Sequence, residues 1–348
     1  MWGLVKQELK QFFSKGVIIF LIIVCLMGIG NTVIYSLGHG GIFEDIGIAQ
    51  GRTYFQLEKE RSKPYEGVIN DTRLDEISAW YSSPEQDSQS SELADIFKSS
   101  VVYGQFRRLL APNEQLELGE QPGPTLSVPL TSLEYYYAPG WVILFQDLVM
   151  WLKPLLLCIL MILGAIPSFA NEYEANMNEI VGSMKYGRKK QAMAKWISSW
   201  IGQTILLLIV FLSAMIPLFF ITGLGGGNAS IQFRVVEYPY LISIRSGTFL
   251  SLFFLWLSML LIGSITMVVS RFTRNKIKTF IISGLFLIVP PLLSVSNMPI
   301  LENIFGLFPL GHANFADISI AYGIAIALFA VVITIICCCL TLNHRGRD

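Results

Sequence analysis

Long apolar runs separated by shorter polar stretches dominate the pattern of hydrophobic and polar positions along the chain. A helix needs about 20 apolar residues to cross roughly 30 Å of hydrocarbon, where lipid offers no hydrogen bonds to an unpaired backbone. Six runs qualify, at about 17–37, 154–170, 196–222, 249–270, 279–296 and 318–341. The pattern predicts an all-α polytopic membrane protein with six transmembrane helices.

A shorter amphipathic pattern precedes the first run. Its large apolar side chains recur at helical spacing among lysines and glutamines, at Trp2, Val5, Leu9, Phe12 and Phe13. Aromatic rings beside lysines are typical of a helix in the membrane interface. We expect an N-terminal interfacial helix, the alternative being a cytosolic extension of span one. That span is expected to be retained, because its apolar run exceeds the core of a usual signal peptide.

The segment 38–139 is the one sizeable polar region, and we expect a domain here between spans one and two. A helical pattern is plausible from 90 to 110, followed by a proline-rich, extended chain. The aromatic residues that close this segment are Tyr135, Tyr136, Tyr137 and Trp141. Such amphipathic rings accumulate in the headgroup zone, so they are expected to anchor the chain there as it re-enters the membrane.

Prolines shape the end of the chain. Pro290 and Pro291 are predicted to interrupt the fifth run. The segment 297–317 is too apolar for a free loop and too rich in proline and glycine for a span. We expect a re-entrant outer hairpin here, before span six. The chain then divides into 1–37 (interfacial helix and span one), the extracellular domain 38–139, and spans two to six in 140–348.

Composition and charge agree with this picture. Hydrophobic residues make up 53% of the 348 residues and charged residues 14%, against about 25% charged in soluble globular chains. The net charge is zero, which by itself says nothing about partners, and we expect no nucleic acid among them. Basic residues are dense in the short loops on the side of the two termini, so the positive-inside rule places both termini in the cytoplasm.

Two opposite charges lie just before the second run. Asp147 interrupts an apolar stretch from Trp141 to Lys153, and we expect an interfacial helix there. A separation of six residues puts Asp147 and Lys153 on different helical faces near a helix end. The alternative is that both are functional charges inside the membrane, where ionisable groups are costly without a role.

Several motifs are absent from the sequence. No G-x-x-x-x-G-K-[ST] occurs, so no phosphate-binding P-loop is expected in this chain. No H-E-x-x-H is present, the three histidines are scattered, and no nucleophile and base are spaced for catalysis. We predict neither catalytic nor metal-binding residues, and no cofactor in this chain.

The second cytoplasmic loop, 171–195, has the most informative charge order. Acids come first, an uncharged middle follows Glu179, and bases from Lys185 to Lys190, with Arg188 among them, close the order; Glu172 and Glu174 are the leading acids. On a helix this order complements the macrodipole, with carboxylates near the positive end and cations near the negative end. The alternative is a loop whose bases merely satisfy the positive-inside rule.

At this loop the chain resembles the permeases of the type-2 family of ABC transporters, which are mostly bacterial exporters. Residues that match the family pattern are Glu172, Glu174, Arg188 and Lys195; residues that depart from it are Asn176 and Met177, in place of Gly-Thr, and Lys185, in place of Pro. The predicted interfacial helix, outer insert and hairpin before span six extend the resemblance over nearly the whole chain.

The resemblance implies a bacterial cell-membrane permease subunit whose coupling helix docks on a separate ATPase. It implies two ATPase subunits that bind ATP and Mg, a second permease chain, the same or homologous, and surrounding membrane lipid. Glu172, Glu174 and Arg188 would be the ATPase-coupling residues. Because the spans carry almost no charge at mid-depth, we expect a hydrophobic or amphipathic cargo: a peptide, an antibiotic or a lipid-linked molecule.

Two other classes of function stay open at this point. An ion-coupled secondary transporter usually needs intramembrane charges and helices broken at matching places in two repeats. A membrane sensor would bind its ligand through the extracellular domain. A copurifying ATPase would distinguish the permease from both.

Overall fold

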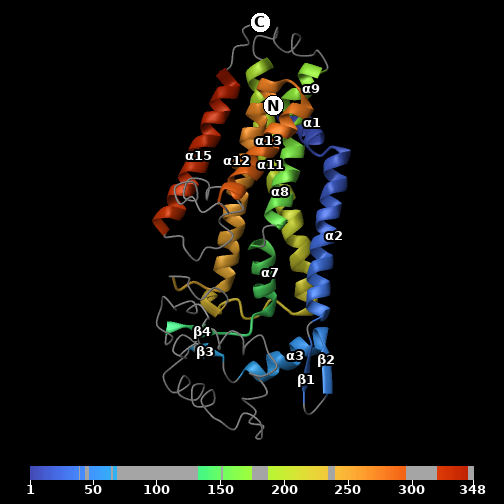
Figure 1. The fold of residues 1–348 in the computed structure, drawn as a ribbon, viewed down its shortest axis with the longest axis vertical. Coiled ribbons are helices and arrows are strands. Elements are labelled where there is room, and N and C mark those ends of the chain that lie inside the picture. Colours follow the sequence, from blue (N-terminus) through green and yellow to red (C-terminus); the bar gives the residue numbers. More distant parts are fainter. Residues whose placement is uncertain are drawn as a thin grey trace.

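The structure is a computed structural model of a mostly helical, elongated chain (Figure 1). It describes residues 1–38, 40–43, 47–63, 66–68, 132–149, 152–174, 187–233, 240–294 and 320–343. Helix α1 and the C-terminal end of α15 lie at one end of the bundle, called here the termini end. The strands and α3 lie at the opposite end. The predicted helix at 90–110 and the predicted hairpin at 297–317 fall outside the described residues.

Among the described residues, four helices are long and apolar enough to cross a membrane. Their bounds are Lys15–Gly38 (α2), Lys153–Glu174 (α8 and α9 together), Lys189–Ile221 within α11 (Gly187–Ile221), and Ile244–Thr273 (α12). They coincide with the first four predicted spans, and this part of the prediction is confirmed. Several extend beyond their apolar runs, because the polar residues at the ends continue the helix.

The fifth and sixth apolar runs are also helical, as α13 (Lys276–Ser294) and α15 (Ile320–Asn343). The predicted interruption at Pro290 and Pro291 is wrong, since α13 continues through both residues. Proline fixes φ near the helical value, and what it removes is an N–H donor. Each proline therefore costs one backbone hydrogen bond, and both lie among the last five described residues of α13.

Helix α1 (Trp2–Phe12) forms as predicted and is anchored to the bundle by its last residue. The Phe12 ring lies between Gly164 of α8 and Gly202 of α11, and a Cβ atom at either glycine would come within 2.6 Å of it. Small residues allow such close approach between membrane helices. One face of α1 is therefore buried in protein, while Trp2, Lys6 and Lys10 remain exposed on the other.

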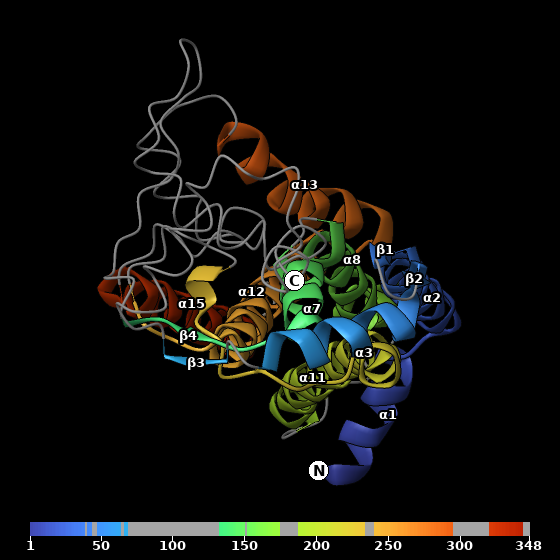
Figure 2. The same cartoon turned by 90° about the horizontal axis from the view of Figure 1, so that it is seen from below.

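The end of the molecule opposite the termini contains short strands that an all-α prediction omitted. Strands β1 (Gly40–Phe43) and β2 (Gly47–Gln50) pair antiparallel, as do β3 (Gly67–Val68) and β4 (Glu134–Tyr135). Helix α3 (Gly51–Ser62) follows β2 and lies across the ends of α7 and α11 (Figure 2). The described part of segment 38–139 is thus a mixed structure packed against the helix ends.

Helix α7 (Pro139–Val149) begins within the aromatic cluster, and the predicted role is wrong for three of its four residues. Tyr135, Tyr137 and Trp141 are buried in protein and do not face lipid. Glu58 of α3 accepts hydrogen bonds from the hydroxyls of Tyr54 (2.8 Å) and Tyr137 (2.7 Å). Burial and the charge of Glu58 raise the pKa of both hydroxyls, which therefore stay protonated donors.

Candidate functional site

The candidate site lies at the termini end and is built around α9 (Pro167–Glu174), which continues the direction of α8 (Leu152–Ala165). The two helices are separated at Ile166, because Pro167 cannot donate the hydrogen bond that would continue α8. The Ser270 hydroxyl of α12 fills this gap. It donates to the Ile166 carbonyl (2.8 Å) and accepts from the Ala170 N–H (3.0 Å), two groups that would otherwise bond each other.

Glu172 joins α9 to α11 through a buried ion pair. Its Oε1 lies 2.5 Å from Lys195 Nζ and also accepts a hydrogen bond from the Gln191 amide. Lys195 is only 1% exposed and donates to the Ser168 carbonyl as well. A buried cation of this kind persists because both a carboxylate and a carbonyl compensate its lost hydration.

Two cations, Lys195 of the ion pair and Arg271 of α12, lie close to the ring of Phe169. Lys195 Nζ lies 4.6 Å from the ring centroid and the Arg271 guanidinium carbon lies 5.3 Å from it. Both distances are within the range of a cation–π interaction. The ring therefore ties α9 to α11 and α12 at once.

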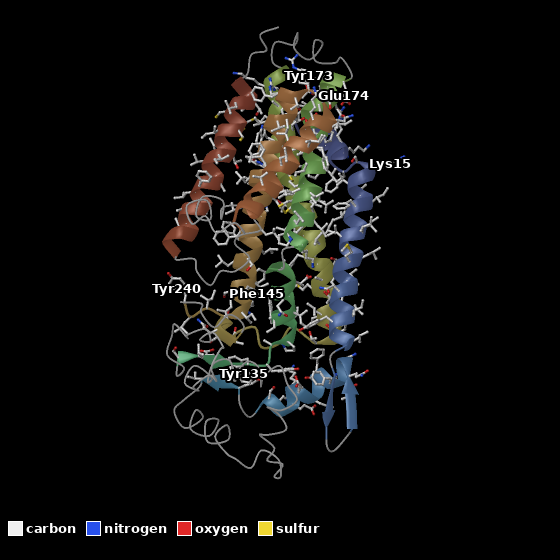
Figure 3. The ribbon with its side chains drawn as sticks, viewed as in Figure 1. Lys15, Tyr135, Phe145, Tyr173, Glu174 and Tyr240 are labelled. Carbon is white, nitrogen blue, oxygen red and sulfur yellow. The ribbon has the colours of Figure 1, made fainter. Side chains whose placement is uncertain are left out.

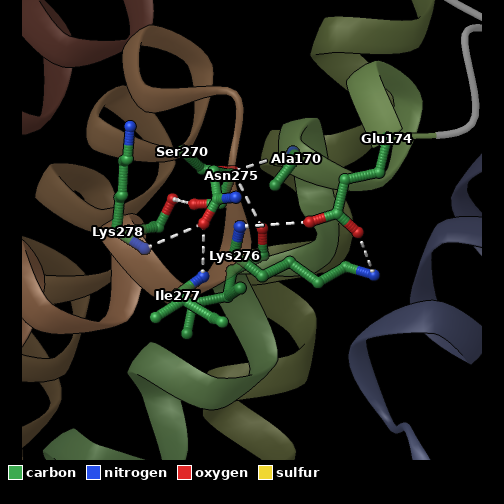
Figure 4. Close-up of polar contacts among 9 residues, drawn as sticks. Ala170, Glu174, Ser270, Asn275, Lys276, Ile277 and Lys278 are labelled. Atoms are coloured by element: carbon green, nitrogen blue, oxygen red, sulfur yellow. Dashed lines mark hydrogen bonds and ion pairs between the residues drawn. The ribbon is translucent and has the colours of Figure 1, made fainter.

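Glu174, the last residue of α9, joins it to α13 (Figure 4). Its Oε1 accepts from the Lys276 backbone N–H (3.3 Å) and its Oε2 lies 2.7 Å from Lys276 Nζ. Asn275 caps the same helix start, accepting from the N–H groups of Ile277 and Lys278. A carboxylate at a helix N-terminus is favourable, since unpaired N–H groups point towards it.

Tyr173, between the two glutamates, contacts the loop from α12 to α13. The Arg274 guanidinium carbon lies 4.9 Å from its ring centroid, and Arg274 itself adopts a left-handed conformation that ends α12. Consecutive side chains on a helix point about 100° apart. Glu172, Tyr173 and Glu174 therefore reach three directions and contact α11, the residue that follows α12 and the start of α13, respectively. Figure 3 shows Tyr173 and Glu174 at the termini end of the bundle.

Glu8 of α1 adds a second carboxylate close to Lys195 and Glu172. Glu8 is 7% exposed, and this burial raises the pKa of its carboxyl group. The negative charge of Glu172 also raises this pKa, whereas the positive charge of Lys195 lowers it. Helix α1 is thus connected to α9 and α11 by charge as well as by the Phe12 ring.

The structure places the predicted coupling residues only in part. Glu172 and Glu174 lie together on α9, and Arg188 lies in the first turn of α11, with its side chain and the residues 175–186 outside the described part. Glu172 and Glu174 are the sixth and eighth residues of α9 and pair with Lys195 and Lys276, and the middle of the predicted helix lies outside the described residues.

A second ionic feature, at mid-bundle, was underestimated from the sequence. Lys153 of α8 donates a hydrogen bond to Asp147 of α7, and both are 7% exposed. The expectation that they lie on different faces of one helix is wrong, because residues 147 and 153 belong to separate helices. The signal available in the sequence was two opposite charges within one apolar stretch.

Neighbouring helices fix the depth of this pair. A Cβ atom at Gly28 of α2 would lie 3.3 Å from Lys153 Nζ and 3.7 Å from the Ser213 hydroxyl of α11. Gly28 is about 20 Å along α2 from Lys15 and about 15 Å from Gly38, at 1.5 Å per residue. The pair therefore lies near the middle of a membrane-spanning helix.

Comparison with known proteins yields no assignment. No family model matches the chain, and no curated protein matches it. Within the described residues, no group of three His, Cys, Asp or Glu side chains could hold a metal ion.

Proposed function

We propose that this chain is the membrane-spanning permease subunit of an ATP-binding-cassette exporter of the type-2 family. The proposal includes six spans, with α13 and α15 as the fifth and sixth, and both termini in the cytoplasm of a bacterial cell. ATP and Mg are bound by two separate ATPase subunits, and a second permease chain, the same or homologous, completes the transport pathway. Glu172, Glu174 and Arg188 are the proposed ATPase-coupling residues.

One observation carries the proposal: three consecutive residues of α9 hold three other helices. A force applied to the chain after Glu174 would act on α11, α12 and α13 together, through Glu172–Lys195, Tyr173–Arg274 and Glu174–Lys276. The coupling loop of a permease needs this arrangement, because it must convert a push at one point into movement of several spans. The sequence also supports the proposal of a separate ATPase, since the chain contains no P-loop of its own.

The proposed cargo is hydrophobic or amphipathic. A groove of about 700 Å³ opens between α11, α12 and α15, and its lining is almost wholly apolar, with two tryptophans, Trp200 and Trp256. Lipid-soluble segments would enter such a groove without desolvating a polar group. A peptide, an antibiotic and a lipid-linked molecule all fit this chemistry.

Copurification tests the proposal. The tagged chain, solubilised from its native membrane, should retain a P-loop ATPase, and Glu174→Lys should reduce ATP-dependent transport while the thermal unfolding midpoint stays within a few degrees. Glu60→Lys, a charge reversal at an exposed position of α3 at the opposite end of the bundle, is the control for charge alone. A chain that purifies without any ATPase and transports on an ion gradient would overturn the proposal.

The Asp147–Lys153 pair favours a second candidate, an ion-coupled secondary transporter. Intramembrane carboxylates beside interrupted helices form the ion sites of such proteins. Here Asp147 and Lys153 lie on two successive helices, α7 and α8. Transport from vesicles that lack ATP, driven by an imposed proton gradient and lost in Asp147→Asn, would support this candidate against the permease.

A further inference from the structure

A pocket of about 630 Å³ lies beside the candidate site, between α1, the junction of α8 and α9, and the start of α13. Its residues divide into two groups. The polar group is Lys10, Gln11, Ser14, Asn171 and Lys276, and the apolar group is Leu163, Ile166, Pro167, Ile277 and Phe280. The pocket is amphipathic, with ammonium groups from two helices and an apolar wall.

The position of the pocket coincides with a membrane boundary. Helix α2 begins at Lys15 and α13 at Lys276, so the polar group of the pocket lies where the apolar helices begin. Ile277 is 71% exposed and Phe280 is 44% exposed, so the apolar wall opens sideways to the surroundings of the bundle. For a helix in a membrane those surroundings are acyl chains.

Charge at this end of the molecule favours an anion. Lysines on the exposed faces nearby are Lys6, Lys10, Lys15, Lys276 and Lys278. Lys276 forms an ion pair with Glu174, which partly neutralises its charge. Its side chain is still 45% exposed, and its ammonium group has further N–H donors. Lys10 is exposed, and none of the described residues that line the pocket is acidic.

We propose that this pocket is a binding site for an anionic glycerophospholipid. The phosphate lies between Lys10 and Lys276, Asn171 and Ser14 offer further hydrogen bonds, and one acyl chain covers Ile277 and Phe280. Basic pockets between membrane helices recognise anionic headgroups in this way. The bound lipid would contact both α1 and α13. The contacts of Glu8 and Glu174 join these two helices only indirectly, because each of the two contacts runs to or from α9.

Native mass spectrometry of the purified chain, titrated with phosphatidylglycerol or phosphatidylcholine, tests this site. Lys10→Gln/Lys276→Gln should lose one tightly bound phosphatidylglycerol, by about fivefold in affinity for each lysine. The matched control is Lys6→Gln/Lys278→Gln, which removes the same charge from the same two helices outside the pocket and should retain that lipid. Glu174→Gln should strengthen binding, because it releases Lys276 from its carboxylate partner.

Three results would overturn the site: equal binding of phosphatidylcholine, equal losses in the lining pair and the control pair, or full displacement of the lipid by glycerol phosphate. The last would assign the pocket to a soluble phosphate compound. Lipid binding is measured here without ATP or an ATPase, so its failure and the failure of the permease proposal are distinguishable.

Discussion

Glu174 binds Lys276 twice, through the backbone N–H and through the ammonium group, and so fixes the end of α9 to the start of α13. Only the second of these contacts depends on the lysine side chain. The first requires an acceptor at position 174 and is lost when the glutamate becomes a lysine.

A charge exchange separates these two contacts. Glu174→Lys should lose most ATP-dependent transport, whereas Glu174→Lys/Lys276→Glu should recover part of it, because the ion pair returns but the backbone acceptor does not. The thermal unfolding midpoint should change little in either variant, since half-exposed ion pairs contribute about 0–1 kcal/mol. Equal transport by the single and double variants would contradict the role of the pair.

The buried pair at mid-bundle makes a prediction about stability. Lys153→Met should leave Asp147 charged and unpaired, at a cost of about 3–5 kcal/mol. Asp147→Leu/Lys153→Met should recover most of that loss, because no buried charge remains. Thermal unfolding in detergent, followed by tryptophan fluorescence, measures the difference. If the double variant is less stable than Lys153→Met, the two charges do not compensate each other.

The close fit of the Phe12 ring against Gly164 and Gly202 predicts a steric clash when either glycine gains a side chain. Gly164→Ala should displace the ring and destabilise the attachment of α1, at the cost of about 1–3 kcal/mol typical of overpacking. Gly284→Ala is the control, since no described atom outside the local helix backbone lies within 4 Å of a Cβ atom there. Phe12→Leu should relieve part of the clash in Gly164→Ala. Limited proteolysis between α1 and α2 reports attachment, and equal cleavage of both alanine variants would refute the close fit.

Glu8 predicts a dependence of stability on pH. Its pKa is raised by burial, so the folded chain holds this proton at pH values where the unfolded chain has lost it. Stability from this group is complete below its ordinary pKa and falls as pH rises through the raised value. Glu8→Gln should therefore unfold at a higher temperature than the wild-type chain near pH 7.5, and the gap should close as pH falls towards 4.5. A gap that widens on acidification would show that Lys195 dominates.

The hydrophobic pattern predicted the helices better than the contacts between them. The first run, 17–37, differs from α2 by a few residues, because apolar periodicity and helix length are local properties. Helix α11 begins at Gly187, well before its apolar run, since Lys189, Lys190 and Lys195 remain helical beyond the hydrocarbon.

Partners distant in sequence were the main source of error. Tyr137 was assigned to the membrane interface, yet its hydroxyl bonds Glu58, 79 residues away, and no local pattern connects the two. Lys153 and Asp147 are near in sequence, but their side chains meet only because they lie on two separate helices, α7 and α8. Glu172 and Glu174 were singled out from the charge order of their loop, while the partner of Glu174, Lys276, was counted only as one of the loop cations.

The most direct test of the central claim places a photo-crosslinking amino acid at position 188, beside the proposed coupling residues. Irradiation of native membranes should join the chain to a P-loop ATPase, and the same probe at Leu241, exposed at the opposite end, should not. If the probe at 188 captures no ATPase, or a membrane-impermeant reagent reaches position 188 from outside intact cells, the permease assignment is wrong.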